Sequence, residues 1–79
     1  MDLILEQLQL IFQEVLDQPD LVLTPHSNAQ TVEDWDSLAH INLVTAIETH
    51  FNVKFALGEL QDLKNVGDIM ALIRRKKAY

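Results

Sequence analysis

The stretch Trp35-Asp36-Ser37-Leu38 joins a long irregular segment to a strongly periodic one. Apolar residues follow it at helical spacing, namely Ile41, Val44, Ile47 and Phe51. Ser37 is therefore expected in the first turn of a helix, where backbone N–H groups lack partners and the dipole presents its positive end. That position suits a phosphate ester on the Ser37 hydroxyl, so we interpret Ser37 as the carrier of a phosphate-linked group. Taken alone, the tripeptide Asp36-Ser37-Leu38 is explained more simply by an N-cap at Asp36 or Ser37. The rest of the chain has to decide between a simple cap and a modified serine.

Apolar periodicity predicts three amphipathic helices, over residues 3–16, 37–51 and 66–76. The side chains expected to face the core are Ile4, Leu8, Ile11, Phe12 and Val15, then Leu43, Val44, Ile47 and Phe51, then Val66, Ile69, Met70 and Ile73. Residues 56–63 are expected to hold a further short helical turn. The helix ends are assigned to Asp2 and Asn65 as N-caps and to Pro19 and Asn52 as stops.

Residues 17–36 show neither a helical nor a strand period, and prolines interrupt them. Such a long irregular segment in a compact domain is unusual, and it is either functional or contains an element that the pattern does not reveal. Leu21, Val22 and Leu23 are too apolar for a free linker and are expected to fold back over the helices. A short turn of helix is an option around residues 30–33.

Length and composition restrict the protein class. The 79 residues suffice for one domain, residues 1–79, and the absence of cysteine excludes disulfides and cysteine-based metal sites. No apolar run approaches a membrane span and no basic region opens the chain, so we expect neither a transmembrane segment nor a signal peptide, and a cytoplasmic monomer.

Charge is distributed unevenly along the chain. The net charge of −6 argues against nucleic acid as a partner. Residues 1–53 hold nine acids and no Lys or Arg, whereas all six basic residues lie between Lys54 and Lys77. The first two-thirds of the fold is therefore expected to present an acidic surface to basic partners.

These features together resemble the acyl carrier protein family, the phosphopantetheine-binding carrier domains. The resemblance rests on Trp35-Asp36-Ser37-Leu38-Ala39-His40-Ile41, on Asn65-Val66-Gly67-Asp68-Ile69, and on the register and length of the helices. It implies an all-α four-helix bundle with a short third helix and a long first loop. It also implies a freestanding carrier that is not an enzyme.

The resemblance further implies a site. Ser37, with Asp36 and Leu38 as its motif neighbours, is then modified by a phosphopantetheinyl transferase that uses coenzyme A and Mg²⁺. The resulting 4′-phosphopantetheine arm holds acyl groups as thioesters and passes them between enzymes of a fatty-acid, polyketide or specialised lipid pathway. The second helix and the loop before it become the docking surface, with Trp35, Leu38, Ile41, Asn42, Thr45 and Glu48 as its residues. As the only tryptophan, Trp35 has a second and more usual role open to it, which is to pack the loop against the bundle.

Two positions depart from the family pattern. Many members have glycine where this chain has Asp34, and many carry a run of acids along the second helix where this chain has Asn42, Thr45 and Thr49 with Glu48. These differences favour a specialised pathway. They also predict that docking depends more on Leu38, Ile41 and Trp35 than on salt-sensitive ion pairs.

Other functions compete with this interpretation. The nearest is a carrier of aminoacyl groups, such as a D-alanyl or peptidyl carrier, and another is a helical adaptor that is never modified. Ser37 and His40, three residues apart, could form a minimal hydrolase, but no acid or oxyanion hole is legible. His26, Glu33, Asp34 and Asp36 do not follow the spacing of a metal site, so no metal is expected.

Overall fold

The computed structural model describes residues 3–56, 58–59 and 63–77. Within that part the chain is all-helical, with helices α1 (Leu3–Val15), α2 (Ser37–Phe51) and α4 (Val66–Lys77) and no strand. The three amphipathic helices are thus confirmed to within a residue at each end. The short turn expected over residues 56–63 falls partly on 57 and 60–62, and the Asp2 cap on residue 2, which lie outside the described residues. A fourth helix therefore stays a prediction.

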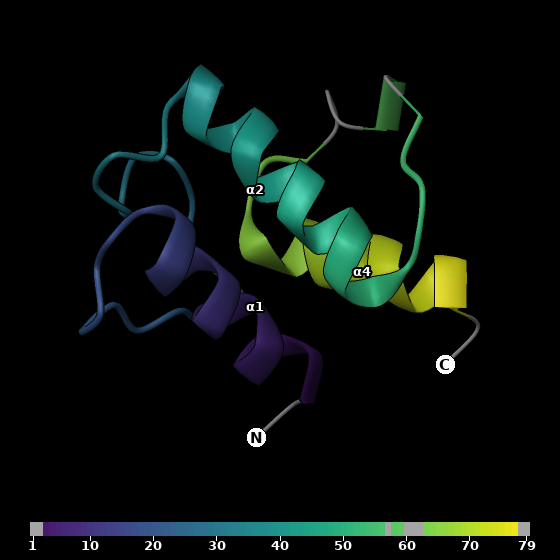
Figure 1. Ribbon diagram of the computed structural model, residues 1–79, viewed down its shortest axis with the longest axis horizontal. Helices are drawn as coiled ribbons and strands as arrows, with labels where there is room; N and C mark the ends of the chain where they lie inside the picture. Colours follow the sequence, from purple (N-terminus) through teal and green to yellow (C-terminus); the bar gives the residue numbers. More distant parts are fainter. Residues whose placement is uncertain (1–2, 57, 60–62, 78–79) are drawn as a thin grey trace.

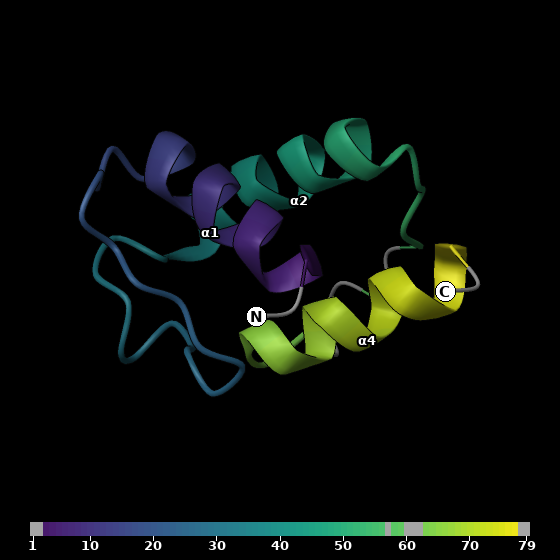
Figure 2. The same ribbon diagram turned by 90° about the horizontal axis from the view of Figure 1, so that it is seen from below.

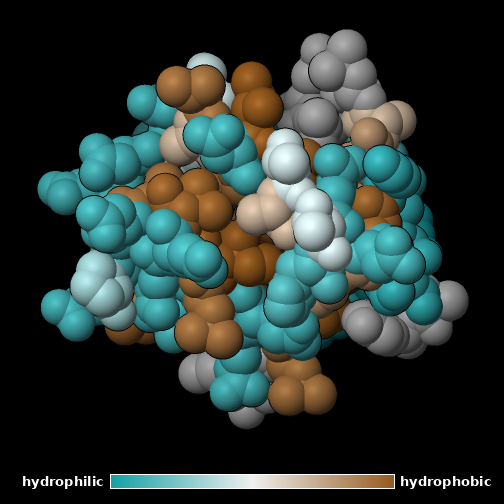
Figure 3. Space-filling view, in the orientation of Figure 1, coloured by the Kyte–Doolittle hydropathy of each residue, from teal (hydrophilic) through white to brown (hydrophobic). Residues whose placement is uncertain are grey.

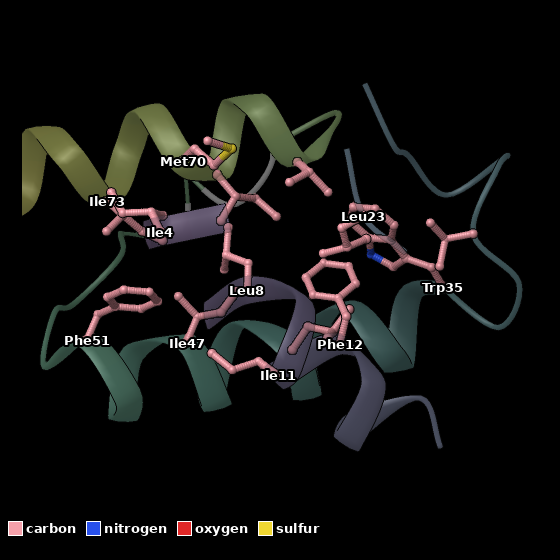
Figure 4. Close-up of a cluster of buried hydrophobic side chains, with 14 of the residues drawn as sticks. Ile4, Leu8, Ile11, Phe12, Leu23, Trp35, Ile47, Phe51, Met70 and Ile73 are labelled. Atoms are coloured by element: carbon pink, nitrogen blue, oxygen red, sulfur yellow. The ribbon is translucent and has the colours of Figure 1, made fainter. Parts of the chain in front are cut away.

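The core lies where α1 crosses α2 and where both rest on α4 (Figure 2). Nearly all the side chains expected to face inward are buried, and Phe12, Leu8, Ile47 and Ile73 have no exposed surface at all. Figure 4 shows α1 side chains between those of α2 and α4, with Phe51 at one end and Trp35 at the other. Burial of this apolar surface is the main force holding the bundle together.

Helix ends follow the sequence closely. Asn52, at the C-terminus of α2, adopts the left-handed conformation with φ 57°, and Asn65 Oδ1 accepts from the Asp68 N–H at 2.8 Å to cap α4. The end of α1 has a different cause from the expected one. Asp17 turns left-handed at φ 54°, and the Gln18 N–H reaches back to the Gln13 carbonyl at 2.9 Å, so the helix stops before Pro19 can act.

The connection between α1 and α2 is packed rather than free (Figure 1). Leu23 is 3% exposed and Leu21 packs against the core, but Val22 is 72% exposed, which corrects the expectation that all three fold back. The segment around residues 28–32 forms a hydrogen-bonded turn rather than a helix, with the Val32 N–H donating to the Asn28 carbonyl.

The same loop is fastened to α4. The Val66 N–H donates to the Ser27 carbonyl at 2.9 Å, and the Gly67 N–H donates to the Pro25 carbonyl at 2.8 Å. Two otherwise unpaired donors of the first turn of α4 are thereby satisfied by backbone from about 40 positions earlier. This contact closes the bundle and fixes the loop that leads to Ser37.

At its other end, α4 is tied to the preceding turn by an ion pair. Lys76 Nζ lies 2.8 Å from Glu59 Oε1, and the Ala56 N–H donates to the same carboxylate. The hydrogen bond from Lys76, followed by that from Ala56, lowers the pKa of Glu59 below its ordinary value. No helix in the described ranges is long and apolar enough to cross a bilayer.

Candidate functional site

Ser37 is the first residue of α2, and Asp36 is its N-cap. Asp36 is extended, with φ −105° and ψ −170°, and its Oδ1 accepts from the Ala39 N–H at 2.8 Å. Asp36 rather than Ser37 is therefore the cap, which leaves the serine hydroxyl free of that task. The Ser37 side chain is exposed, and within the described part of the chain no hydrogen bond engages its hydroxyl.

The backbone before the cap turns sharply at Asp34. Its φ is 66°, in the left-handed region that glycine adopts most readily. The Asp36 N–H then donates to the Asp34 carbonyl at 3.0 Å across this turn. Asp34 occupies the position where the resemblance expects glycine, and aspartate tolerates that conformation better than most residues do. The departure in sequence therefore keeps the geometry that glycine provides.

Trp35 lies inside the protein. Its side chain is 6% exposed, and its ring meets Phe12 of α1 edge-on at a centroid distance of 5.0 Å (Figure 4). Its Nε1–H donates to His40 Nδ1 at 3.1 Å. This burial confirms that Trp35 packs the loop against the bundle and removes it from the residues of an exposed docking surface. Sequence reasoning missed the bond to His40, although the five-residue separation across a helix start is within reach of such a pair.

The described residues around Ser37 lack the contact between serine and base that a hydrolase uses. His40 is half-buried and its Nδ1 is occupied by Trp35, and within the described residues no hydrogen bond joins it to Ser37. A nucleophilic serine needs a base in hydrogen-bond contact with its hydroxyl. The acids near His26 likewise form no cluster, since the described ranges contain no group of three or more potential metal ligands.

The remaining candidate residues lie along α2. Leu38 and Ile41 are 69% and 61% exposed and adjoin Ser37, and Figure 3 shows hydrophobic side chains reaching the surface over the first turns of α2. Asn42 and Thr45 are exposed and line a groove of about 480 Å³ between α1 and α2. Glu48 is half-buried, because its carboxylate accepts from the Phe55 N–H at 2.8 Å. Part of the negative charge of Glu48 is therefore used in a hydrogen bond that fixes the segment after α2.

The geometry fits a phosphodiester on Ser37. The hydroxyl projects into solvent from a first turn whose Ser37 and Leu38 N–H groups have no carbonyl partner within the helix. The positive end of the helix dipole favours an anion there. A group attached at this exposed position borders the exposed Leu38.

Comparison with known proteins gives a consistent result. Residues 6–73 match the family model described as "Phosphopantetheine attachment site". The solved solution structure of a holo acyl carrier protein from Geobacter metallireducens is similar, with 49% identity and a TM-score of 0.87 over 94% of this chain and 85% of that one. No curated protein sequence matches the chain significantly.

Proposed function

The chain belongs to the acyl carrier protein family, whose members hold a covalently attached 4′-phosphopantetheine, and from this premise we propose that Ser37 is the attachment residue. The observation that carries the proposal is the exposed hydroxyl of Ser37 at the start of α2, beside a cap made by Asp36. Only one other serine occurs in the chain, and Ser27 is 9% exposed with its Oγ accepting from the Thr24 N–H. Ser37 is therefore the serine an attaching enzyme can reach.

In this proposal the protein presents cargo and performs no chemistry on it. The attached group supplies a thiol that holds acyl cargo as a thioester. Asp36 fixes the helix start, Leu38 borders the attachment point, and Ser37 supplies the tether. A flexible arm on a rigid helix start converts the encounter of cargo and docked enzyme into an intramolecular event at high effective concentration.

We place the docking surface on the solvent side of α2, next to Ser37. Leu38 and Ile41 supply its apolar centre, and Asn42, Thr45 and Glu48 supply polar contacts around it. Exposed leucine and isoleucine side chains this close together are uncommon on a free surface and suit burial by a partner. Its partners are the phosphopantetheinyl transferase and the enzymes that load and process the cargo of a fatty-acid, polyketide or specialised lipid pathway.

The attachment test is a measurement of intact mass. The protein is incubated with coenzyme A, Mg²⁺ and a broad-specificity phosphopantetheinyl transferase. We expect the wild type and the Ser27→Ala control each to gain one prosthetic group, and Ser37→Ala to gain none. Because Ser27→Ala removes the other serine, it separates loss of the attachment point from loss of a hydroxyl in general.

Two results oppose the proposal, and each points to another function. A wild-type protein that gains no mass behaves as the unmodified adaptor. A protein that hydrolyses an activated ester without pretreatment, and loses that activity in His40→Ala, behaves as the hydrolase.

A further inference from the structure

A hydrogen bond between two side chains spans the start of α2. The Trp35 Nε1–H donates to His40 Nδ1 at 3.1 Å, and the two rings lie edge to edge, with centroids 6.0 Å apart and planes 21° from parallel. Trp35 precedes the Asp36 cap and His40 ends the first turn, so the bond brackets Ser37 from both sides. The proposed attachment chemistry leaves both side chains without a role.

The bond determines the chemical state of His40. An indole N–H can only donate, so Nδ1 of His40 has to be an unprotonated acceptor, and the ring proton lies on Nε2. A doubly protonated imidazole offers donors at both nitrogens and cannot take part. The acids next to the pair along the chain, Glu33, Asp34 and Asp36, are all exposed, and α1 contributes the uncharged ring of Phe12 to the contact.

The pair also connects the site to the core. Trp35 is 6% exposed and meets Phe12 edge-on, so its ring cannot move without opening the packing between the loop and α1. Since the Trp35 side chain is buried and its indole N–H is at least partly so, loss of the acceptor leaves a donor without a protein partner, which is costly. The hydrogen bond to His40 therefore fixes the position of the Trp35 ring. Trp35 in turn fixes the backbone from which Asp36 caps α2 and Ser37 projects.

We propose that Trp35 and His40 are positioning residues for the modification of Ser37: their bond, made with unprotonated Nδ1, fixes the helix start in the form that the transferase recognises. This inference rests on the proposed function. It concerns only the orientation of Ser37, because neither side chain is expected to touch the reacting atoms.

The test uses three variants of the full chain. His40→Gln keeps an acceptor at the end of the side chain, His40→Leu removes it, and Trp35→Phe keeps an aromatic ring but removes the donor. We expect His40→Leu and Trp35→Phe each to lower kcat/KM of the transferase by about tenfold. His40→Gln is expected to restore most of the rate. The double variant Trp35→Phe/His40→Leu is expected to lose no more than either single one, because both remove the same bond.

Nuclear magnetic resonance supplies a readout independent of loading. In the wild type we expect an unprotonated Nδ1 on His40 and slow solvent exchange of the Trp35 indole N–H. That exchange is expected to stay slow in His40→Gln and to become fast in His40→Leu. Melting curves of all variants identify any that fail to fold.

The inference is overturned if folded His40→Leu is loaded at the wild-type rate, or if the single losses add in the double variant. It is also overturned if the indole N–H exchanges as fast in the wild type as in His40→Leu. A wild type that accepts no prosthetic group overturns the proposed function instead, and that outcome is visible before any variant is compared.

Discussion

At the scale of single residues, Asp34 has a backbone conformation that limits which side chains the position tolerates. With φ at 66°, it takes a conformation that costs most L-residues about 1–2 kcal/mol. We expect Asp34→Gly to change the free energy of unfolding by less than about 1 kcal/mol, because relief of strain offsets the entropy that glycine adds to the unfolded chain. Asp34→Val, with a branched side chain, is expected to lose about 1–2 kcal/mol.

Urea denaturation of the purified variants measures both changes. The matched control is Glu33→Val, which puts the same side chain on an exposed neighbour whose φ is not positive. Equal stabilities for the two valine variants are incompatible with a left-handed requirement at Asp34.

The residues of the site show which of its features can be predicted from the sequence. A cap at Asp36 or Ser37, the start of the helix at Ser37 and the exposed Leu38 and Ile41 follow from helical periodicity and capping preferences, which act within a few residues, whereas the choice of Asp36 as the cap comes from the structure. The bond between Trp35 and His40 and the bond between Glu48 and the Phe55 N–H do not follow, because each depends on how an irregular segment packs against α2. Local pattern specifies which face of a helix is apolar, but it does not specify what covers a side chain in a loop.

At the scale of elements, the junction of the first loop with α4 depends on a residue without a side chain. A Cβ built on Gly67 lies 3.0 Å from the Pro25 carbonyl oxygen and 3.3 Å from Asn65 Oδ1. The Pro25 oxygen already accepts from the Gly67 N–H at 2.8 Å, so it cannot retreat without lengthening that bond. We expect Gly67→Ala to destabilise the protein by about 1 kcal/mol, since the strained contact outweighs the better helix propensity of alanine.

Gly58→Ala is the control, because a Cβ at Gly58 meets nothing within 4 Å. Thermal melting of both variants measures the difference, and hydrogen exchange of the Val66 and Gly67 amides localises it. If the Gly67→Ala protein is as stable as the Gly58→Ala protein, the loop shifts freely away from α4 and the prediction is wrong. The sequence could not predict this junction, because a backbone hydrogen bond between positions about 40 apart leaves no periodic trace.

At the scale of the whole molecule, the charges separate along the fold. In Figure 1 the first loop and the beginning of α2 lie to the left, whereas the last turn of α4, with Arg74, Arg75, Lys76 and Lys77, lies to the right. The acids of residues 1–53 have no basic residue among them in the chain. We therefore expect long-range attraction to turn the Ser37 end toward a basic partner, with the basic end of α4 facing away. Orientation by such a field affects the rate of encounter more than the strength of the complex.

The strength of the docked complex is expected to come from the apolar centre of the docking surface. Ile41→Ala is predicted to raise KM of the transferase about tenfold, since burying such a side chain against a partner is worth roughly 1.5 kcal/mol or more. Leu10→Ala on α1 is the matched control, because Leu10 is 64% exposed against 61% for Ile41 but lies away from Ser37 in the chain, and it is expected to change nothing. Raising the salt concentration is expected to cost less than Ile41→Ala, because exposed ion pairs are individually weak. A KM that rises steeply with salt while Ile41→Ala leaves it unchanged means that charge, rather than the apolar side of α2, holds the partner.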